Sequence, residues 1–125
     1  MKFAKIVFRI AAIWGFLIIT PLYFIFDLIG KNDPPPITHP GFYYGFVGVA
    51  LVWQFAFLII ATDPIRFRPL IIAAILEKLA YSIPVIILIS QKRMHPNDLI
   101  FAAIDFFLCV LFVMAYLRTP RTAAQ

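Results

Sequence analysis

Four ionisable side chains lie within, or at the edge of, long apolar stretches of this 125-residue sequence. They are Asp27, Glu77, Lys78 and Asp105. A charged group is costly in the hydrocarbon layer of a membrane, so residues of this kind usually serve a ligand, an ion or a proton. A carboxyl group there can hold the polar end of a lipophilic molecule or exchange a proton with it. The alternative is a packing role with a hydrogen-bond partner.

Glu77 is expected to point into a helix bundle. Small residues and one tyrosine lie near it on the same helix: Ala73, Ala74, Ala80 and Tyr81. Small side chains let another helix approach closely, which would exclude lipid and most water. We therefore expect Glu77 to be uncharged at pH 7 and to hydrogen-bond with Gln54, with Tyr81 or with a backbone carbonyl freed by a proline.

Lys78 and Asp105 are expected to lie apart from Glu77. Lys78 is the next residue and is rotated by about 100° around the helix, so its ammonium group is expected to reach the cytoplasmic headgroups. Asp105 is counted from the opposite surface of a hydrocarbon core about 30 Å thick, which separates it from Glu77 by roughly 10 Å in height. A direct pair of carboxylates is therefore not expected.

His39 and His95 join Asp27 and Asp105 in the predicted outer half of the protein. Two imidazoles and two carboxylates could bind a divalent metal, but no fixed ligand spacing supports this. The sequence also lacks the motifs of nucleotide-binding loops, serine hydrolases, zinc proteases and C-x-x-C redox sites. We predict no cofactor, no metal and no catalytic residue, with His39 and His95 as the alternative metal ligands.

The composition indicates a membrane protein. Hydrophobic residues make up 63% of the chain, charged residues only 14%, and the mean hydropathy is +0.95. A soluble domain is about half apolar and about a quarter charged. Four apolar segments, at about 6–29, 41–61, 70–90 and 99–117, are each long enough to span a bilayer. The prediction is one all-α domain, a four-transmembrane-helix bundle with helices one and three kinked at Pro21 and Pro84.

The basic residues predict the orientation of these four helices. If the N-terminus is cytoplasmic, seven basic residues face the cytoplasm: Lys2, Lys5, Arg9, Arg66, Arg68, Arg118 and Arg121. Three lie outside: Lys31, Lys92 and Arg93. The positive-inside rule then puts both termini in the cytoplasm, at the inner membrane if the cell is bacterial. Because the basic residues form small groups at helix ends and no stripe, binding of nucleic acid is not expected.

Gly41, Gly45 and Gly48 lie near one face of the second predicted helix. Glycines at this spacing let a second helix approach closely, so this face could bind a protein partner or a second copy of the chain. Ordinary packing inside the bundle explains the pattern equally well.

Two stretches of the sequence resemble one membrane protein family. Phe26-Asp27-Leu28, at the predicted end of helix one, and Leu51-Val52-Trp53-Gln54-Phe55 are similar to the EXPERA group, which includes emopamil-binding sterol isomerases and the sigma-2 receptor. The resemblance implies a pocket for a lipophilic ligand between the helices. Those proteins carry a glutamate one turn before the glutamine, where this chain has Ala50, so the isomerase reaction is not carried over.

The four-helix plan also resembles the DoxX-like proteins. The stretches 63–69 and 75–78 look like those of small bacterial four-helix integral membrane proteins, a likeness that implies no particular activity.

We therefore expect a non-catalytic membrane protein that binds a lipid-like ligand within the bundle or serves as an accessory subunit of a membrane complex. The candidate ligand-binding residues are Asp27, Gln54, Glu77, Tyr81 and Asp105. The alternative is an enzyme acting on a sterol-like or quinone-like substrate, with proton transfer by the carboxyl groups of Asp27, Glu77 or Asp105.

Overall fold

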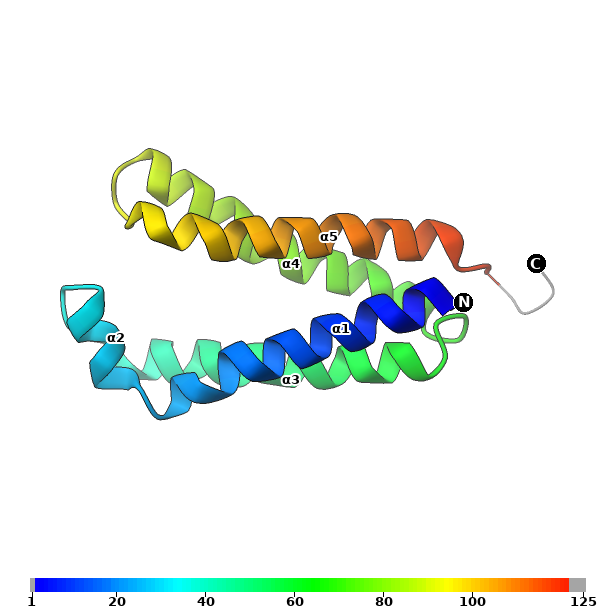
Figure 1. Cartoon of the computed structure of the whole chain (residues 1–125), viewed down its shortest axis with the longest axis horizontal. Helices are drawn as coiled ribbons and strands as arrows, with labels where there is room; N and C mark the ends of the chain where they lie inside the picture. Colours follow the sequence, from blue (N-terminus) through cyan, green and yellow to red (C-terminus); the bar gives the residue numbers. More distant parts are fainter. Residues whose placement is uncertain (1, 122–125) are drawn as a thin grey trace.

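The computed structural model describes residues 2–121, and this part of the chain is built from helices. The α-helices are α1 (Lys2–Ile19), α2 (Phe26–Asn32), α3 (Pro40–Thr62), α4 (Arg68–Ser90) and α5 (Leu99–Arg118) (Figure 1). Two short 3-10 helices are η1 (Thr20–Tyr23) and η2 (Pro96–Asp98). The prediction of an all-α bundle with four long apolar helices is confirmed.

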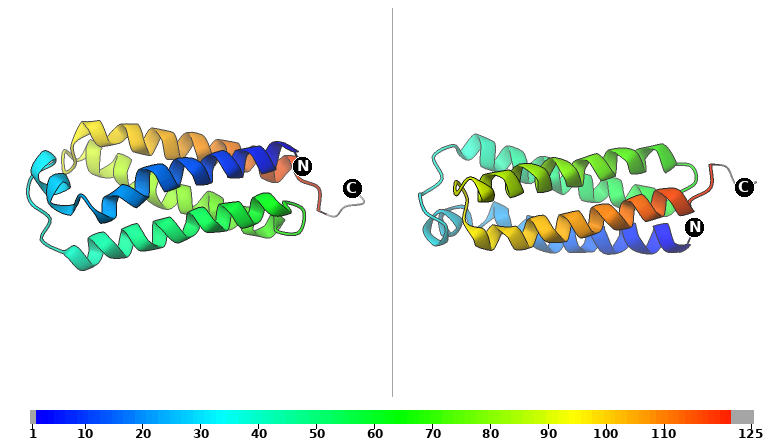
Figure 2. Two further views of the ribbon diagram at one scale, coloured as in Figure 1. Left: turned by 60° about the horizontal axis from the view of Figure 1, so that its bottom comes forward. Right: turned by 90° about the horizontal axis from the view of Figure 1, so that it is seen from above.

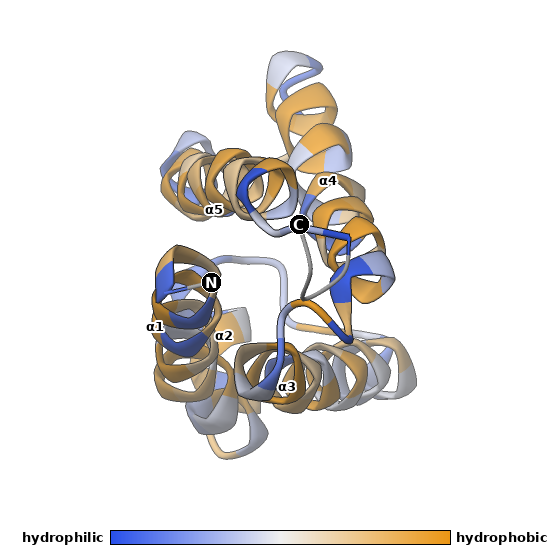
Figure 3. Cartoon of the chain, turned by 90° about the vertical axis from the view of Figure 1, so that its right-hand side faces the viewer, coloured by the Kyte–Doolittle hydropathy of each residue, from blue (hydrophilic) through white to orange (hydrophobic). Residues whose placement is uncertain are grey.

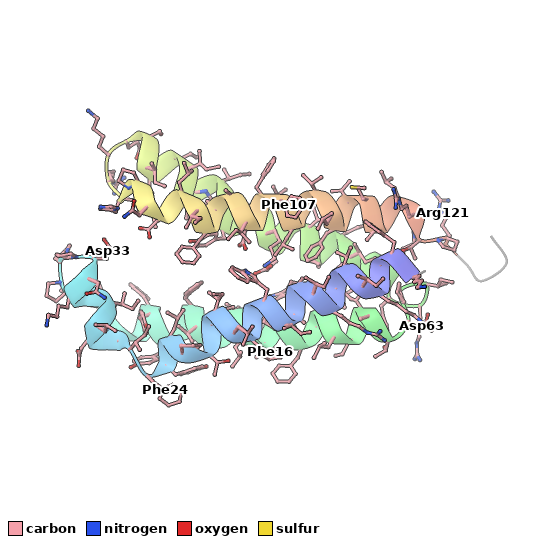
Figure 4. All side chains as sticks on the ribbon, in the orientation of Figure 1. Phe16, Phe24, Asp33, Asp63, Phe107 and Arg121 are labelled. Atoms are coloured by element: carbon pink, nitrogen blue, oxygen red, sulfur yellow. The ribbon has the colours of Figure 1, made fainter. Side chains whose placement is uncertain are left out.

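Four helical segments within residues 2–121 are long and apolar enough to cross a bilayer. They are Lys2–Tyr23, Pro40–Thr62, Arg68–Ser90 and Pro96–Arg118, with mean hydropathies of 1.9, 2.1, 2.0 and 2.5. Apolar residues predominate along the long helices in Figure 3. Large apolar side chains such as Phe24 and Phe107 are 83% and 61% exposed and point away from the bundle (Figure 4). A surface of this kind is stable against lipid, so the chain is an integral membrane protein.

The first predicted segment, 6–29, is divided in the structure. The kink expected at Pro21 takes the form of a break, because proline has no N–H to donate to the preceding turn. Helix α1 therefore ends at Ile19 and η1 follows, with the Phe24 amide donating to Pro21 O at 2.9 Å. Residues from Phe26 onward form α2, a separate short helix. The other three long helices begin and end within two residues of the predicted bounds, and α4 continues on both sides of Pro84.

The long helices form two antiparallel hairpins, α1 with α3 and α4 with α5 (Figures 1 and 2). We call the end that holds the start of α1, the connection 63–67 and the end of α5 the terminal end. The opposite end, with α2 and the connection 91–95, is the loop end. The ribbons of the two hairpins lie closest at the terminal end and diverge toward the loop end (Figure 1).

An aromatic cluster joins the hairpins in the half of the bundle nearer the terminal end. The rings of Phe8 and Phe112 are stacked with centroids 4.4 Å apart, and Phe57 lies 5.2 Å from Phe112 and 5.8 Å from Phe8. All three side chains are fully buried. Ala11 and Ala115, also buried, keep this part of α1 and α5 narrow enough for close packing.

The terminal end is also held by arginine contacts. Arg68 Nε donates to Thr119 O at 2.8 Å, and its guanidinium lies 3.8 Å from the centre of the Tyr116 ring. Arg118 lies 4.5 Å above the Phe3 ring. These contacts connect the start of α4 and the end of α5 to each other and to α1, so the hairpins are fixed at one end and separate at the other.

Candidate functional site

A cavity of about 340 Å³ lies between the two hairpins. Much of its wall is apolar and comes from α1, η1, α3 and α5: Trp14, Ile18, Leu22, Phe46 and Phe101. Five polar side chains also line it: Gln54, Glu77, Lys78, Tyr81 and Asp105. A largely apolar cavity of this size with a few polar groups on its wall is typical of a site for a small lipophilic molecule.

Lys78 lies at the centre of the polar group. Its side chain is only 6% exposed, and Nζ is 3.5 Å from Asp105 Oδ1 and 3.6 Å from Glu77 Oε2. Nζ also lies 5.2 Å from the centre of the Phe57 ring. The expectation that Lys78 reaches the headgroups is therefore wrong. Two carboxyl groups and an aromatic face are available nearby, and they stabilise the ammonium group inside the bundle.

Glu77 and Asp105 contact the same ammonium group, so the predicted height difference of roughly 10 Å between the two carboxyl groups is too large. Counted from the terminal end, Glu77 lies about 14 Å along α4 and Asp105 about 20 Å along α5. The remaining height difference is small enough for the long Lys78 side chain to bridge. Part of the difference arises because α4 begins at Arg68, two residues before the predicted Leu70, whereas α5 begins at Leu99 as predicted.

Ser82 contacts α5 beside this cluster. Its hydroxyl is fully buried and lies 2.9 Å from Lys78 O and 3.3 Å from Ala102 O, so it can donate to either carbonyl. Ser82 is one helical turn after Lys78, so the two residues lie on the same face of α4, which faces α5. Ser82 was not among the residues expected to matter from the sequence. The spacing of Lys78 and Ser82 on one helix face, opposite a small residue on α5, was the available signal.

Gln54 places an unsatisfied acceptor at the cavity. The residue is 1% exposed, and its Nε2 donates to Ala50 O at 2.8 Å, one turn earlier on α3. Its Oε1 accepts no hydrogen bond from residues 2–121. Gly15 of α1 packs directly against the Gln54 side chain, and a larger residue there would overlap it. An unsatisfied buried acceptor costs roughly 1–3 kcal/mol, so a hydrogen-bond donor that reaches this oxygen would stabilise the bundle.

Glu77 faces the interior, as predicted, but without the expected partners. Its side chain is 19% exposed, and Oε2 accepts no hydrogen bond within the described part of the chain. Gln54 donates to its own helix and does not donate to Glu77. The expectation of an uncharged Glu77 assumed that Lys78 pointed elsewhere, and the observed Lys78 contact removes that premise.

Asp27, His39 and His95 lie outside this cavity. Asp27 is exposed in the first turn of α2, because the break at Pro21 puts it in a separate helix. His39 is exposed with its ring 5.3 Å from that of Phe42, and exposed His95 accepts from the Asn97 amide at 3.1 Å. Among the described residues no three His, Cys, Asp or Glu side chains come together as a metal-ligand group. The alternative metal site therefore does not form there.

The glycines of α3 do not share one environment. A Cβ atom added at Gly41 or Gly45 would meet nothing within 4 Å in the described structure, whereas one at Gly48 would lie 3.3 Å from the Tyr23 hydroxyl. Packing inside the bundle therefore does not account for Gly41 and Gly45, which lie on the outer surface.

Comparison of the chain with models of known protein families, with curated proteins and with solved structures gives no match.

Proposed function

We propose that this protein binds a lipid-like molecule in the cavity between its two hairpins. The observation that carries the proposal is the unsatisfied Gln54 Oε1 at the wall of an otherwise largely apolar cavity. The apolar part of such a molecule matches the aromatic and aliphatic wall. Its polar end matches the region of Gln54, Glu77 and Asp105.

The energetics of the polar cluster support a binding role. Burying an ion pair gives little net stability, because the desolvation of both charges offsets their attraction. Apolar side chains would pack this part of the bundle at lower cost. A buried Lys78 with two carboxyl groups is therefore better explained by recognition of a polar group than by stability.

A second candidate is an enzyme acting on a lipophilic substrate. Two carboxyl groups from different helices flank one ammonium group at the cavity wall, and groups coupled in this way can hold and pass on a proton. Proton transfer to a bound substrate would use Glu77 or Asp105. The outer position of Asp27 does not favour it in this role.

The role of an accessory subunit, alone or with ligand binding, is supported by the outer face of α3. Gly41 and Gly45 are exposed with open space around them, and glycine pairs of this spacing are common where membrane helices meet. A partner helix, or α3 of a second copy, would fit against this face.

For the orientation we propose that both termini lie in the cytoplasm, at the inner membrane if the cell is bacterial. Seven basic residues gather at the terminal end, and three lie at the loop end: Lys31, Lys92 and Arg93. Such an excess on one side favours the cytoplasm for the terminal end.

Native mass spectrometry of the gently extracted protein tests the binding proposal. We expect an adduct of constant mass on the parent protein and its loss in Ala50→Leu, which fills the cavity from α3. The matched control is Ala103→Leu, the same change at an exposed position of α5. If Ala50→Leu loses helical content, Ile18→Trp fills the same cavity from α1. The absence of any adduct on the parent, or an unchanged adduct on both filled variants, would contradict the proposal.

A further inference from the structure

A second hollow, of about 580 Å³, lies between α3 and α4. Its wall is formed by apolar side chains of both helices, among them Phe46, Val49, Trp53, Ala73, Leu76 and Ala80. Val49 and Leu76 are 63% and 59% exposed, so this groove opens toward the lipid. Ala73 and Ala80 were expected to mark a close helix contact. That expectation is wrong for Ala80, which is exposed; Ala73 is half-buried at the groove, and Ala74 is fully buried in the core.

The groove adjoins the cavity. Four residues line both: Phe46, Ala50, Glu77 and Tyr81. A molecule whose polar end lies in the cavity can therefore leave its hydrocarbon chain in the groove, in contact with the bilayer.

The groove lies at the depth of the hydrocarbon core. Phe46 and Trp53 are about 9 Å and 20 Å along α3 from its start at the loop end, and Glu77 is about 14 Å along α4 from the terminal end. In a core about 30 Å thick these positions are central. A molecule that enters here brings its polar group through hydrocarbon, which favours a small uncharged group over a phosphate or carboxylate. Glu77 and Asp105 also outnumber Lys78 and would repel an anionic group.

The unsatisfied atoms narrow the chemistry further. Gln54 Oε1 accepts no hydrogen bond within residues 2–121, and Glu77 Oε2 has only the Lys78 ammonium group nearby, at 3.6 Å; both atoms are acceptors. A hydroxyl group donates to such atoms, whereas an ester, an ether or a ketone cannot. We infer that the ligand is a lipid alcohol that enters from the bilayer through the groove between α3 and α4. This inference rests on the function proposed above.

Tryptophan fluorescence provides a readout inside the cavity. The chain has two tryptophans, Trp14 at the cavity and Trp53 at the groove. Trp53→Phe keeps an aromatic ring on the groove and leaves Trp14 as the reporter. In phosphatidylcholine nanodiscs, dibrominated oleyl alcohol should quench Trp14 in a saturable way. Its methyl ether and dibrominated oleate should bind about tenfold more weakly or worse, because each lacks the neutral donor. Equal quenching by alcohol and ether would overturn the assignment of a lipid alcohol.

The entry route is tested in the same background. Ala73→Leu with Ala80→Leu fills the groove without changing the polar cluster, and Ala103→Leu repeats the change at an exposed position of α5. We expect the groove variant to weaken quenching by the alcohol about tenfold or more, and the control to match its parent. If the groove variant loses helical content, Ala80→Leu alone serves, because that position is exposed.

The outcomes separate this inference from the function on which it rests. Unchanged quenching in the groove variant would overturn the entry route. An adduct of constant mass on the parent protein, with no quenching by any brominated probe, would overturn the inference and leave the binding proposal standing. If neither an adduct nor quenching is observed, both the binding proposal and this inference are contradicted.

Discussion

At the scale of the residue, the most consequential side chain is Lys78. It is buried between two carboxyl groups, so its removal should leave two neighbouring acids in the bundle without a countercharge. We expect Lys78→Met to lower the free energy of unfolding by roughly 3–5 kcal/mol, as measured by denaturation in mixed micelles. A lysine that only reached the headgroups would lose almost nothing on this change.

The control for Lys78 removes the charges together. A triple variant, with Lys78→Met, Glu77→Gln and Asp105→Asn, should regain most of the lost stability, because no uncompensated charge stays buried. Equal destabilisation of the single and the triple variant would show that shape, and not charge, is what Lys78 contributes.

Glu77 should be less critical for stability than for binding. In Glu77→Gln, Lys78 keeps Asp105 as a partner at 3.5 Å, so we expect the free energy of unfolding to stay within about 1 kcal/mol of the parent. Glu77→Leu removes the acceptor and should abolish the adduct seen by native mass spectrometry. Retention of the adduct by Glu77→Leu would exclude Glu77 from ligand contact.

The sequence was informative about which residues matter here and less so about how they meet. Gln54, Glu77, Tyr81 and Asp105 stood out as polar groups in apolar helices, and the structure brings all four to one cavity. Lys78 was assigned the wrong surroundings, because rotation around one helix does not tell which neighbour occupies each side. That information comes from packing across the hairpins, where Ser82 contacts Ala102 O.

At the scale of the helix, two glycines offer a matched comparison. Gly15 packs against the Gln54 side chain, whereas Gly45 has open space around it. Gly15→Ala should force Gln54 aside or α1 away from α3, with an expected loss of roughly 1–3 kcal/mol in the free energy of unfolding. Gly45→Ala should gain about 0.5–1 kcal/mol, because alanine is the better helix former. Equal effects of the two changes would mean that α1 and α3 do not meet at Gly15.

The open face of α3 leads to a separate prediction about association. Gly45→Leu should leave the monomer folded, since a side chain there meets nothing in the described bundle. If Gly41 and Gly45 meet a second copy, the same change should weaken the dimer at least about tenfold in a fluorescence energy transfer assay between labelled chains in vesicles. A parent protein that is monomeric in this assay would end the hypothesis.

The bounds of α3, α4 and α5 were predictable because hydrophobic length and flanking polar residues determine them. The form of the break at Pro21 was not, because a proline inside an apolar stretch can bend a helix or end it. The form of this break changes the position of Asp27, one of the candidate ligand-binding residues. Asp27 was expected at the end of helix one, and it lies instead on α2, away from the cavity.

At the scale of the whole molecule, the cavity lies toward the loop end, whereas most of the basic residues lie at the terminal end. The hairpins are joined by the aromatic cluster and the arginine contacts toward the terminal end, and they diverge toward the loop end (Figure 1). Met94, in the connection between α4 and α5, lines the cavity from the loop end. With the terminal end in the cytoplasm, the cavity is closed toward the cytoplasm and lies toward the outer leaflet.

Site-directed labelling tests this orientation. In a Cys109→Ala background, Asn32→Cys and Asn97→Cys at the loop end should react with a membrane-impermeant thiol reagent in intact cells, because both positions are exposed. Thr62→Cys, exposed at the terminal end, should react only after the cells are permeabilised. Thr122→Cys should behave in the same way, although Thr122 lies outside the described residues. Labelling of Thr62→Cys in sealed cells would show that the orientation is the reverse of the proposed one. Because the two hairpins are packed together in one bundle, the cavity would then lie toward the inner leaflet.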